Sequence, residues 1–420
     1  MHTTFRLLLA ILVLPAFGAL AAPLPETTPE TAGLSSDRLA HLTSTLSAAI
    51  ESGELPGAVI MIARDGKLVY SQSLGWQDKP GGVAMRDDSI FRIYSMTKPI
   101  VSVGAMMLVE QGKLSLDEPV SKYIPAFSDM KVSVEPSDAT ENAAPTIVDA
   151  DRPITIQDLL RHTSGLTYQS TGTPTEVKRR YKQANIFSQH WTLEDFANTL
   201  ATLPLQYQPG TTWEYGHSTD ILGRVIEVVT SMPLDRYLEQ YIFAPLRMEN
   251  SAFRVAPAKH GRIAEPIPDK YTGKTPMLID VRDRVTFLAG GHGLTSTAGD
   301  YLRFSQMLLN GGELDGVRLL GPKTVRYIAS NHLNETISKG HYYIPGPGYG
   351  FGLGFATRLE YGQSNWPASV GEFYWGGYAG TYFWIDPEER LVVSYMSVEP
   401  LRRQHYRVLL RNLVYQAIME

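Results

Sequence analysis

The sequence predicts an α/β chain of the α+β type: one antiparallel sheet built from both ends of the chain, flanked by helices and interrupted by a long, mainly helical region. The first observation behind this prediction is a hairpin pattern over 58–70, where apolar runs of strand length flank an Asp-Gly turn. The second is a similar hairpin pattern over 383–396, close to the opposite end of the chain. The third is the alternation of helical periodicity with loops from about 155 to 325. Strands near both ends therefore predict a single sheet with helices inserted between its halves.

Helical patterns next to these strands predict helices that cover the sheet. Residues 35–51 repeat apolar side chains at the spacing of one helix face, at Leu39, Leu42, Leu46 and Ile50. A last helix is expected from about 402 to 418. Both segments are amphipathic, so each has an apolar face that a sheet can bury.

The interior of the chain contains a helix of a different kind. Residues 96–111 are apolar on almost every side and are followed by Gly112, the residue type that commonly follows a helix end. A helix that is apolar all round is buried in a core. Pro99 removes one backbone N–H from its first turn, so we expect that turn to be distorted.

The remaining helical signals are local. Thr155 begins a capping-box pattern, and residues around 221–229 form an amphipathic helix that Ser218, Thr219 or Asp220 would cap. Polar residues over 126–152, with scattered Pro, Asp and Ser, predict a loop or a small excursion.

These elements predict one domain over residues 22–420. Its sheet part would comprise about 30–90 and 340–420, and its helical part about 95–330. A cleft would lie between the two parts, and ligand sites commonly form at such junctions. We therefore expect the active site there.

The first 21 residues have the pattern of a secretory signal peptide. Arg6 precedes an apolar run from Leu7 to Leu20, and small residues at 19–21 indicate cleavage after Ala21. The run is too short to span a membrane comfortably and is broken by a proline. We therefore expect a secreted or periplasmic protein with no integral membrane segment after cleavage.

Composition excludes several classes of function. The chain has no cysteine, so it has no disulfide, no thiol nucleophile and no cysteine-ligated zinc. Its net charge of −5 includes no long basic run, which argues against nucleic-acid binding. The sequence has neither the His-Glu-x-x-His pattern of zinc hydrolases nor the Gly-x-Ser-x-Gly elbow of α/β-hydrolases. We expect no metal and no cofactor.

A serine and a lysine one helical turn apart give the strongest chemical signal. Ser95 and Lys98 stand where the buried helix begins, about 4.5 Å apart along a helix axis. A desolvated lysine in that position is able to take the proton of a serine hydroxyl and make it a nucleophile. Backbone N–H groups at a helix N-terminus also favour developing negative charge.

The spacing alone also fits a structural role, because Ser95 could be an N-cap and Lys98 a surface residue. The chain contains a second copy at Ser128 and Lys131, in a polar stretch with no apolar helix after it. We interpret that copy as solvated surface.

A serine–lysine pair also needs a proton partner for the lysine and hydrogen-bond donors for an oxyanion, and two later segments could supply them. Tyr215 precedes the amphipathic helix and could share a proton with Lys98. Trp375, Gly376 and Gly377 enter the late strands, where paired glycines indicate a bulge or a close approach of backbone or ligand. A backbone N–H there, together with that of Ser95, could form an oxyanion hole.

Taken in order, these motifs resemble those of the serine β-lactamase/penicillin-binding superfamily. Within it, the chain is most similar to the class C-type branch and the family VIII carboxylesterases. The resemblance also includes the segments 159–166 and 290–297 and extends from about residue 30 to 418. It implies the β-lactamase-like fold and assigns Ser95 as the acyl-accepting nucleophile, with Lys98 and Tyr215 as the base. The N–H groups of Ser95 and Tyr378 would form the oxyanion hole.

Two departures from the family pattern bear on the substrate. Many members carry Lys-Thr-Gly where this chain has Trp375-Gly376-Gly377, so the lysine that faces a substrate carboxylate is replaced by an aromatic wall. His217 stands where class C enzymes have an asparagine. We assign Trp375, Gly376, Gly377 and His217 to substrate binding and expect neutral, short-chain acyl esters as substrates.

The resulting prediction is a carboxylesterase that works through an acyl-Ser95 intermediate on a small-molecule ester. Three alternatives remain open: a β-lactamase or D-alanyl peptidase, an acyltransferase of the same fold, and a non-catalytic module that senses cell-wall peptide. The natural substrate and the oligomeric state are outside what the sequence determines.

Overall fold

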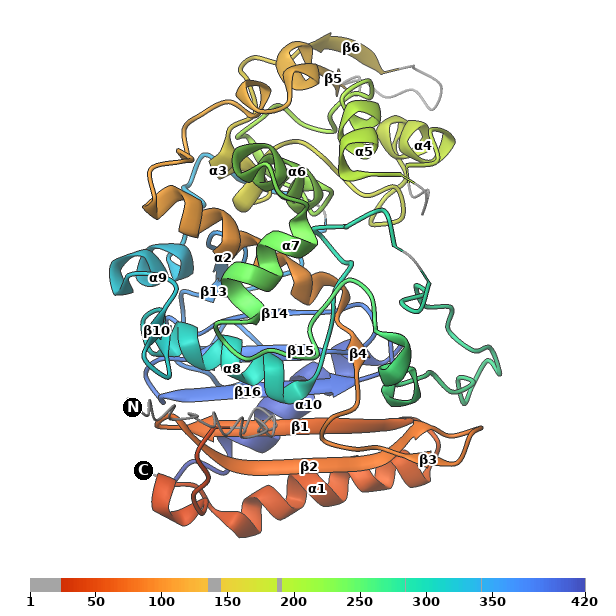
Figure 1. Ribbon diagram of the computed structural model, residues 1–420, viewed down its shortest axis with the longest axis vertical. Coiled ribbons are helices and arrows are strands. Elements are labelled where there is room, and N and C mark those ends of the chain that lie inside the picture. Colours follow the sequence, from red (N-terminus) through yellow and green to blue (C-terminus); the bar gives the residue numbers. More distant parts are fainter. Residues whose placement is uncertain (1–23, 135–144, 187–190, 284, 341, 420) are drawn as a thin grey trace, which may run out of the picture.

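The computed structural model describes residues 24–134, 145–186, 191–283, 285–340 and 342–419 (Figure 1). The expected signal peptide and its cleavage point after Ala21 lie outside these residues. None of the described helices has the length and apolar character needed to cross a membrane.

An eight-stranded sheet forms the base of the structure, in the order β12-β13-β14-β15-β16-β1-β2-β3, with every neighbouring pair antiparallel. The central pairing of β1 with β16 joins the two ends of the chain, with Ile60 opposite Tyr395. The strands are β1 Gly57–Arg64, β2 Lys67–Asp78, β3 Val83–Ala84, β12 Tyr349–Phe351, β13 Ala356–Arg358, β14 Phe373–Gly376, β15 Tyr382–Asp386 and β16 Leu391–Ser397. Both predicted hairpins and the sheet built from both termini are confirmed.

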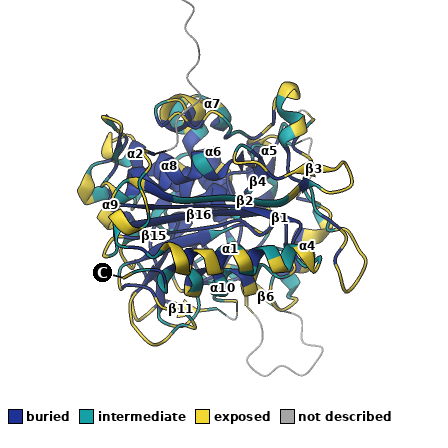
Figure 2. Ribbon diagram, turned by 90° about the horizontal axis from the view of Figure 1, so that it is seen from below, coloured by how far each residue is buried: buried dark blue, intermediate teal, exposed yellow. Residues whose placement is uncertain are grey.

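Helices cover both faces of this sheet, which is why β1 and β16 are buried along their whole length. Helices α1 (Ser36–Glu51) and α10 (Arg403–Tyr415) lie over the same outer face (Figure 2). Helix α8 (Ala298–Leu309) packs on the opposite face against β16, β1 and β15. Ser35 caps α1 by accepting the Arg38 N–H. Both terminal helices therefore form where their amphipathic patterns predict.

The helical region lies above α8 in Figure 1 and is centred on α2 (Thr97–Glu110) and α6 (Ser218–Thr230). The capping box at Thr155 is present and begins α3. The other described elements are α3 Ile156–Leu160, α4 Glu176–Gln183, α5 Leu193–Leu200, α7 Leu234–Leu238, α9 Pro322–Ala329, β4 Phe91–Arg92, β5 Lys131–Val134, β6 Thr146–Asp149, β7 Thr212–Trp213, β8 Thr295–Ser296, β9 Glu313–Leu314, β10 Val317–Arg318 and β11 Ser338–Lys339.

Helix α2 is buried from Thr97 to Leu108, as its apolar composition predicts. A 3₁₀ turn over Tyr94–Met96 precedes it, in agreement with the distortion expected from Pro99. Ser95 lies in this turn and does not cap α2, because the cap position is Met96. The structural alternative for Ser95 is therefore wrong.

One local expectation needs correction. The residue at the cap of α6 is His217, with no side-chain cap bond, because Ser218, Thr219 and Asp220 already lie inside the helix. The segment 126–152 forms a small excursion, as predicted, and its described residues include most of the 3₁₀ turn Pro125–Asp129 and the antiparallel pair β5–β6. Its residues 135–144 lie outside the described part of the chain.

Candidate active site

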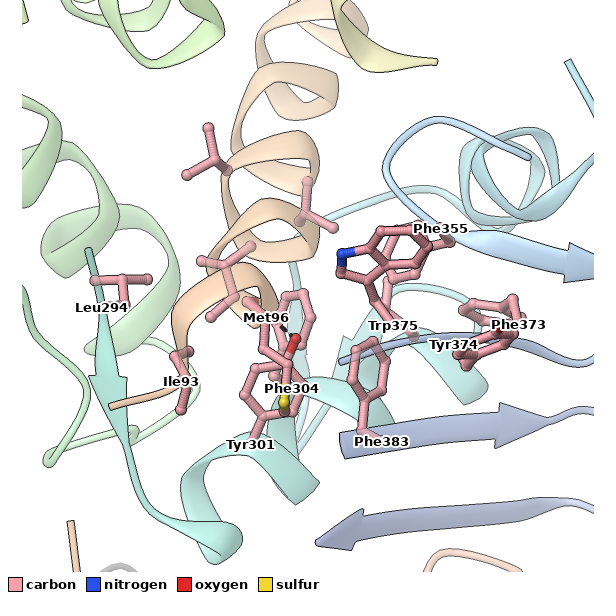
Figure 3. Packing of buried hydrophobic residues seen from close by; sticks show 14 of the residues in the cluster. Ile93, Met96, Leu294, Tyr301, Phe304, Phe355, Phe373, Tyr374, Trp375 and Phe383 are labelled. Atoms are coloured by element: carbon pink, nitrogen blue, oxygen red, sulfur yellow. Dashed lines mark hydrogen bonds between the residues drawn. The ribbon is translucent and has the colours of Figure 1, made fainter. Parts of the chain in front are cut away.

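Ser95 projects from a turn that is held in place on several sides. Tyr94 has a left-handed backbone with φ of 44°, which costs a non-glycine residue about 1 kcal/mol. The turn is fixed from below by the Tyr301 hydroxyl, which donates to the Met96 carbonyl at 2.9 Å. Figure 3 shows Met96 among the buried side chains of Ile93, Tyr301 and Phe304. This packing anchors the backbone that carries the Ser95 hydroxyl.

Lys98 points back toward Ser95 from the first turn of α2. Its Nζ is 3.4 Å from Ser95 Oγ, and only 1% of the residue is exposed. The same nitrogen donates to the Gly291 carbonyl at 2.8 Å and to the Tyr168 hydroxyl at 3.1 Å. The structure therefore brings together the predicted nucleophile and base, and it places the amine among oxygen acceptors with no carboxylate in direct contact among the described residues.

Tyr215 lies beside Lys98 but contacts it through its ring. Lys98 Nζ is 4.5 Å from the Tyr215 ring centroid, and the Tyr215 hydroxyl accepts a hydrogen bond from Trp375 Nε1 at 3.3 Å. The tyrosine hydroxyl that bonds Lys98 in this structure is that of Tyr168. Sequence reasoning gave Tyr168 no role.

The approach of two loops explains how both tyrosines reach Lys98. A Cβ at Gly216 would lie 2.4 Å from the Leu166 carbonyl oxygen, so only glycine allows the two loops to touch there. The rings of Tyr168 and Tyr215 meet edge to face at 5.4 Å. Tyr168 lies two residues after the motif segment 159–166, and that proximity is the one sequence signal that could have indicated it.

Burial sets the protonation state of Tyr168. Desolvation, followed by the negative charge of Asp220 and the neighbouring Tyr215, raises its pKa well above the usual value of 10. The hydroxyl therefore stays neutral and acts as a hydrogen-bonding partner of Lys98.

The end of β14 forms the other side of the site. Gly377 donates to the Thr381 carbonyl at 2.8 Å, and a Cβ on it would lie 2.2 Å from Thr381 Oγ1 and 2.3 Å from the Ile93 carbonyl oxygen. The glycine therefore permits the chain to pass next to the turn that carries Ser95. Within the described residues, neither the Ser95 N–H nor the Tyr378 N–H has an acceptor. The geometry of the described residues thus leaves both N–H groups without a hydrogen bond, and their role as an oxyanion hole stays a prediction.

Two histidines, the fully buried His217 and the partly exposed His292, flank one carboxylate behind Tyr168. Asp220 accepts from His217 Nδ1 at 2.9 Å and from the Gly291 N–H at 2.8 Å, and His292 Nδ1 is 3.9 Å away. Burial raises the pKa of Asp220, but the His217 hydrogen bond and the nearby His292, His217 and Lys98 outweigh it and lower that pKa to about 2. Desolvation lowers the pKa of His292 to about 4 and also lowers that of His217. Both imidazoles are therefore neutral at pH 7, and Asp220 is an anion near Lys98.

His217 does not reach the substrate space that sequence reasoning assigned to it. Its side chain is fully buried, with its ring 4.4 Å from that of Tyr168. Its Nδ1 bonds Asp220, three residues further along the chain, and this contact holds the ring inside the protein. His217 therefore holds Asp220 through a hydrogen bond, whereas His292 lines the cavity.

A cavity of about 480 Å³ opens in front of Ser95. Its walls are mainly aromatic, and include Tyr168, Tyr215, Phe253, Phe287 and Trp375. Trp375 is buried and its indole forms one wall, whereas Tyr378 lies at the rim with 46% of its surface exposed. Such a cavity suits a small apolar group next to the nucleophile.

The other candidate residues lie elsewhere. Ser128 is exposed, and Lys131 forms ion pairs with Asp129 and Asp149, so the second Ser-x-x-Lys copy is solvated surface as predicted. In the part of the chain that the structure describes, no group of three or more His, Asp, Glu or Cys side chains is arranged to hold a metal ion.

Comparisons with known proteins agree with this geometry. Residues 42–412 match the family described as Beta-lactamase, so the chain belongs to that family. Esterase EstB of Burkholderia gladioli is 29% identical over 367 residues, covering 83% of this chain and 87% of EstB. Lovastatin esterase of Penicillium rubens is 30% identical over 334 residues, covering 76% of this chain and 80% of that enzyme.

Solved structures show the same fold. EstCE1, described as a hydrolase with promiscuous acyltransferase activity, superposes with a TM-score of 0.76 at 27% identity. The match covers 90% of this chain and 99% of EstCE1. The predicted superfamily and fold are confirmed, and the chain's relatives include esterases and a hydrolase that transfers acyl groups.

Proposed function

We propose that this protein is a carboxylesterase that cleaves short-chain acyl esters through a covalent acyl-Ser95 intermediate. The observation that carries the proposal is the contact of Ser95 Oγ with the buried Lys98 Nζ, 3.4 Å apart, at an aromatic cavity. A buried amine bonded to neutral oxygens is in a position to accept a proton. The similarity to EstB and to lovastatin esterase supports ester hydrolysis.

The reaction follows from these positions. The Lys98 amine takes the Ser95 proton as Oγ attacks the ester carbonyl, and the N–H groups of Ser95 and Tyr378 bind the resulting oxyanion. The carbon–oxygen bond to the alcohol then breaks. The alcohol leaves with a proton that Lys98 supplies through the Tyr215 hydroxyl, which turns from Trp375 to do so. Water, activated by the same base, attacks the acyl-enzyme and releases the acid with Ser95 restored.

The walls of the cavity favour neutral acyl groups. Trp375 stands where many relatives place a cation, and its indole is held by a hydrogen bond to Tyr215. We therefore place β-lactam hydrolysis and D-alanyl peptidase activity second. Transfer of the acyl group to an alcohol uses the same intermediate, and the description of EstCE1 supports it as a secondary activity.

We also propose that the protein works outside the cytoplasm, in the periplasm or as a secreted enzyme, on the basis of the pattern over 1–21. The N-terminus of the protein recovered from the periplasm or the medium of the producing cells tests this. Mass spectrometry is expected to find Ala22 as the first residue, and an intact N-terminus would contradict the proposal.

Parallel assays with p-nitrophenyl butyrate and nitrocefin test the function. We expect rapid ester hydrolysis, little nitrocefin turnover, and no activity in Ser95→Ala, whose fold should persist. Ser128→Ala is the matched control because it removes the serine of the surface copy, and it should retain full activity. Activity in Ser95→Ala would contradict the mechanism, and efficient nitrocefin turnover would contradict the choice of substrate.

A further inference from the structure

The peptide bond between Gly377 and Tyr378 has a cation on its carbonyl side. Arg407, in the second turn of α10, donates from Nη2 to the Gly377 carbonyl oxygen at 2.9 Å. A longer bond of 3.4 Å reaches the same oxygen from the Gly380 N–H. In a trans peptide the C=O and N–H point in opposite directions. Holding the carbonyl toward Arg407 therefore directs the Tyr378 N–H away from the guanidinium, and Tyr378 and Arg407 both line the cavity in front of Ser95.

Arg407 has no acidic partner among the described residues. Helix α10 carries Arg403 one turn earlier and contains no Asp or Glu, and no ion pair within the described part of the chain reaches the Arg407 guanidinium. Its Nε is buried without a hydrogen-bond partner, and Cζ lies 5.2 Å from the Tyr382 ring centroid. Desolvation lowers the pKa of Arg407 below its usual value. A partly desolvated cation whose hydrogen bond goes to one carbonyl polarises that carbonyl strongly.

The local sequence leaves room for this contact. A Cβ at Gly376 would lie 2.4 Å from Arg407 Nη2, 2.7 Å from Cζ and 3.0 Å from Nε. The guanidinium thus rests directly on the Gly376 backbone, and any larger residue would displace it. The missing side chain of Gly376 leaves space for the Arg407 guanidinium, and that of Gly377 leaves space for the turn that carries Ser95.

From this contact we infer that Arg407 is a positioning residue of the oxyanion hole. Its guanidinium fixes the orientation of the Gly377–Tyr378 peptide and polarises it, which strengthens the Tyr378 N–H as a donor to the negative oxygen of the tetrahedral intermediate. The inference rests on the proposed acyl-Ser95 chemistry. It adds to that chemistry a residue whose side chain acts through the backbone and does not touch the reacting atoms.

Arg407→Met tests the inference because it removes the donor and keeps most of the apolar stem. Ester hydrolysis and binding of phenylboronic acid, which forms an anionic tetrahedral adduct on a serine, are measured on each variant. Fluorophosphonate titration counts the competent sites and thermal unfolding reports folding. We expect kcat and boronate affinity to fall together by about 10- to 100-fold, with KM within about 3-fold, because only the tetrahedral species carries the oxyanion.

Two further arginine variants separate positioning from charge. Arg403→Met removes an equal charge one turn earlier, where the guanidinium lies over the Tyr378 ring with Cζ 5.1 Å from its centroid and makes no bond to Gly377. It should lower boronate affinity by no more than about 3-fold. Arg407→Lys keeps a cationic donor and should recover part of the loss.

A double-mutant cycle isolates the contact itself. Gly376→Ala should displace the guanidinium and lower kcat in the wild-type background, yet cost little further in Arg407→Met, where nothing remains to be displaced. Additive losses in the two variants would contradict the inference.

Three other results would overturn the inference. Equal losses in Arg407→Met and Arg403→Met would mean that charge alone matters. A loss confined to an ester bearing a carboxylate, such as mono-p-nitrophenyl glutarate, would make Arg407 an anion-binding residue. Wild-type values in Arg407→Met would give it no role. If the wild-type protein itself neither cleaves p-nitrophenyl butyrate nor binds the boronate, the proposed function fails first and the inference fails with it.

Discussion

Replacing Tyr168 by phenylalanine removes one hydrogen bond from Lys98 and leaves the packing of the ring unchanged. The Tyr168 hydroxyl accepts from Lys98 Nζ at 3.1 Å, and Nζ keeps the Gly291 carbonyl at 2.8 Å and Ser95 Oγ at 3.4 Å. The Tyr168 ring meets the Tyr215 ring edge to face at 5.4 Å between centroids, and phenylalanine keeps that ring. The substitution therefore tests whether this bond holds the amine in position for proton transfer.

The expected magnitude follows from the kind of bond that is lost. A hydrogen bond to a charged group is worth about 1.5–3 kcal/mol, and about 1.4 kcal/mol corresponds to a tenfold change in rate. We therefore expect kcat to fall by about 10- to 100-fold, while KM stays within about 3-fold because Lys98 acts on Ser95 and not on the bound acyl group. The free energy of unfolding should change little, since Lys98 retains two oxygen partners.

Steady-state hydrolysis of p-nitrophenyl butyrate, corrected for fluorophosphonate-titrated sites, measures this effect. Tyr181→Phe is the matched control, because the Tyr181 hydroxyl is buried, lies in the same cluster of rings and has no hydrogen-bond partner among the residues that the structure describes. It should keep wild-type kcat. A wild-type kcat in Tyr168→Phe, or an equal loss in Tyr181→Phe, would refute the reasoning.

Gly377→Ala would place a Cβ 2.2 Å from Thr381 Oγ1 and 2.3 Å from the Ile93 carbonyl oxygen, so the backbone must shift and kcat should drop by at least about 100-fold. Gly261→Ala, with no atom within 4 Å of the added Cβ, is its control, and equal kinetics in both would contradict the role of this turn. The pKa of His292 is lowered by burial to about 4 against about 6.5 in the unfolded chain, so the unfolded state binds the extra proton and stability falls as pH drops through this range. At about 1.4 kcal/mol per unit the contribution approaches about 3 kcal/mol. Between pH 7 and pH 4.5, urea unfolding should show a smaller loss of unfolding free energy in His292→Gln than in the wild-type protein. An equal loss in the two proteins would contradict this contribution of His292.

Local patterns predicted the parts of the fold and site that depend on neighbouring residues. The periodicity of 35–51 and 402–418 indicated the terminal helices because burial of one face repeats with the helix turn. Ser95 and Lys98 are three residues apart, so their contact is fixed by the helix itself. The glycines at 376 and 377 signalled a close approach without saying what approaches.

Tertiary contacts account for what the sequence left out. Tyr168 reaches Lys98 only because two loops meet at Gly216, and no spacing encodes that meeting. His217 is turned inward because Asp220 lies three residues on, within the same first turn of α6. Arg407 lies in the last helix, 30 positions after Gly377, and the amphipathic pattern of that helix gives no sign that this arginine contacts Gly377. Its chemistry depends on a neighbour that the sequence does not name.

The measurement that tests the central claim most directly is intact-protein mass spectrometry after rapid acid quench of a reaction with p-nitrophenyl butyrate. The account predicts a species heavier by one butyryl group, with the acyl group on the peptide that contains Ser95, and no such species in Ser95→Ala. Turnover of the ester with no acyl-enzyme at any quench time, or an acyl group on another residue, would contradict it.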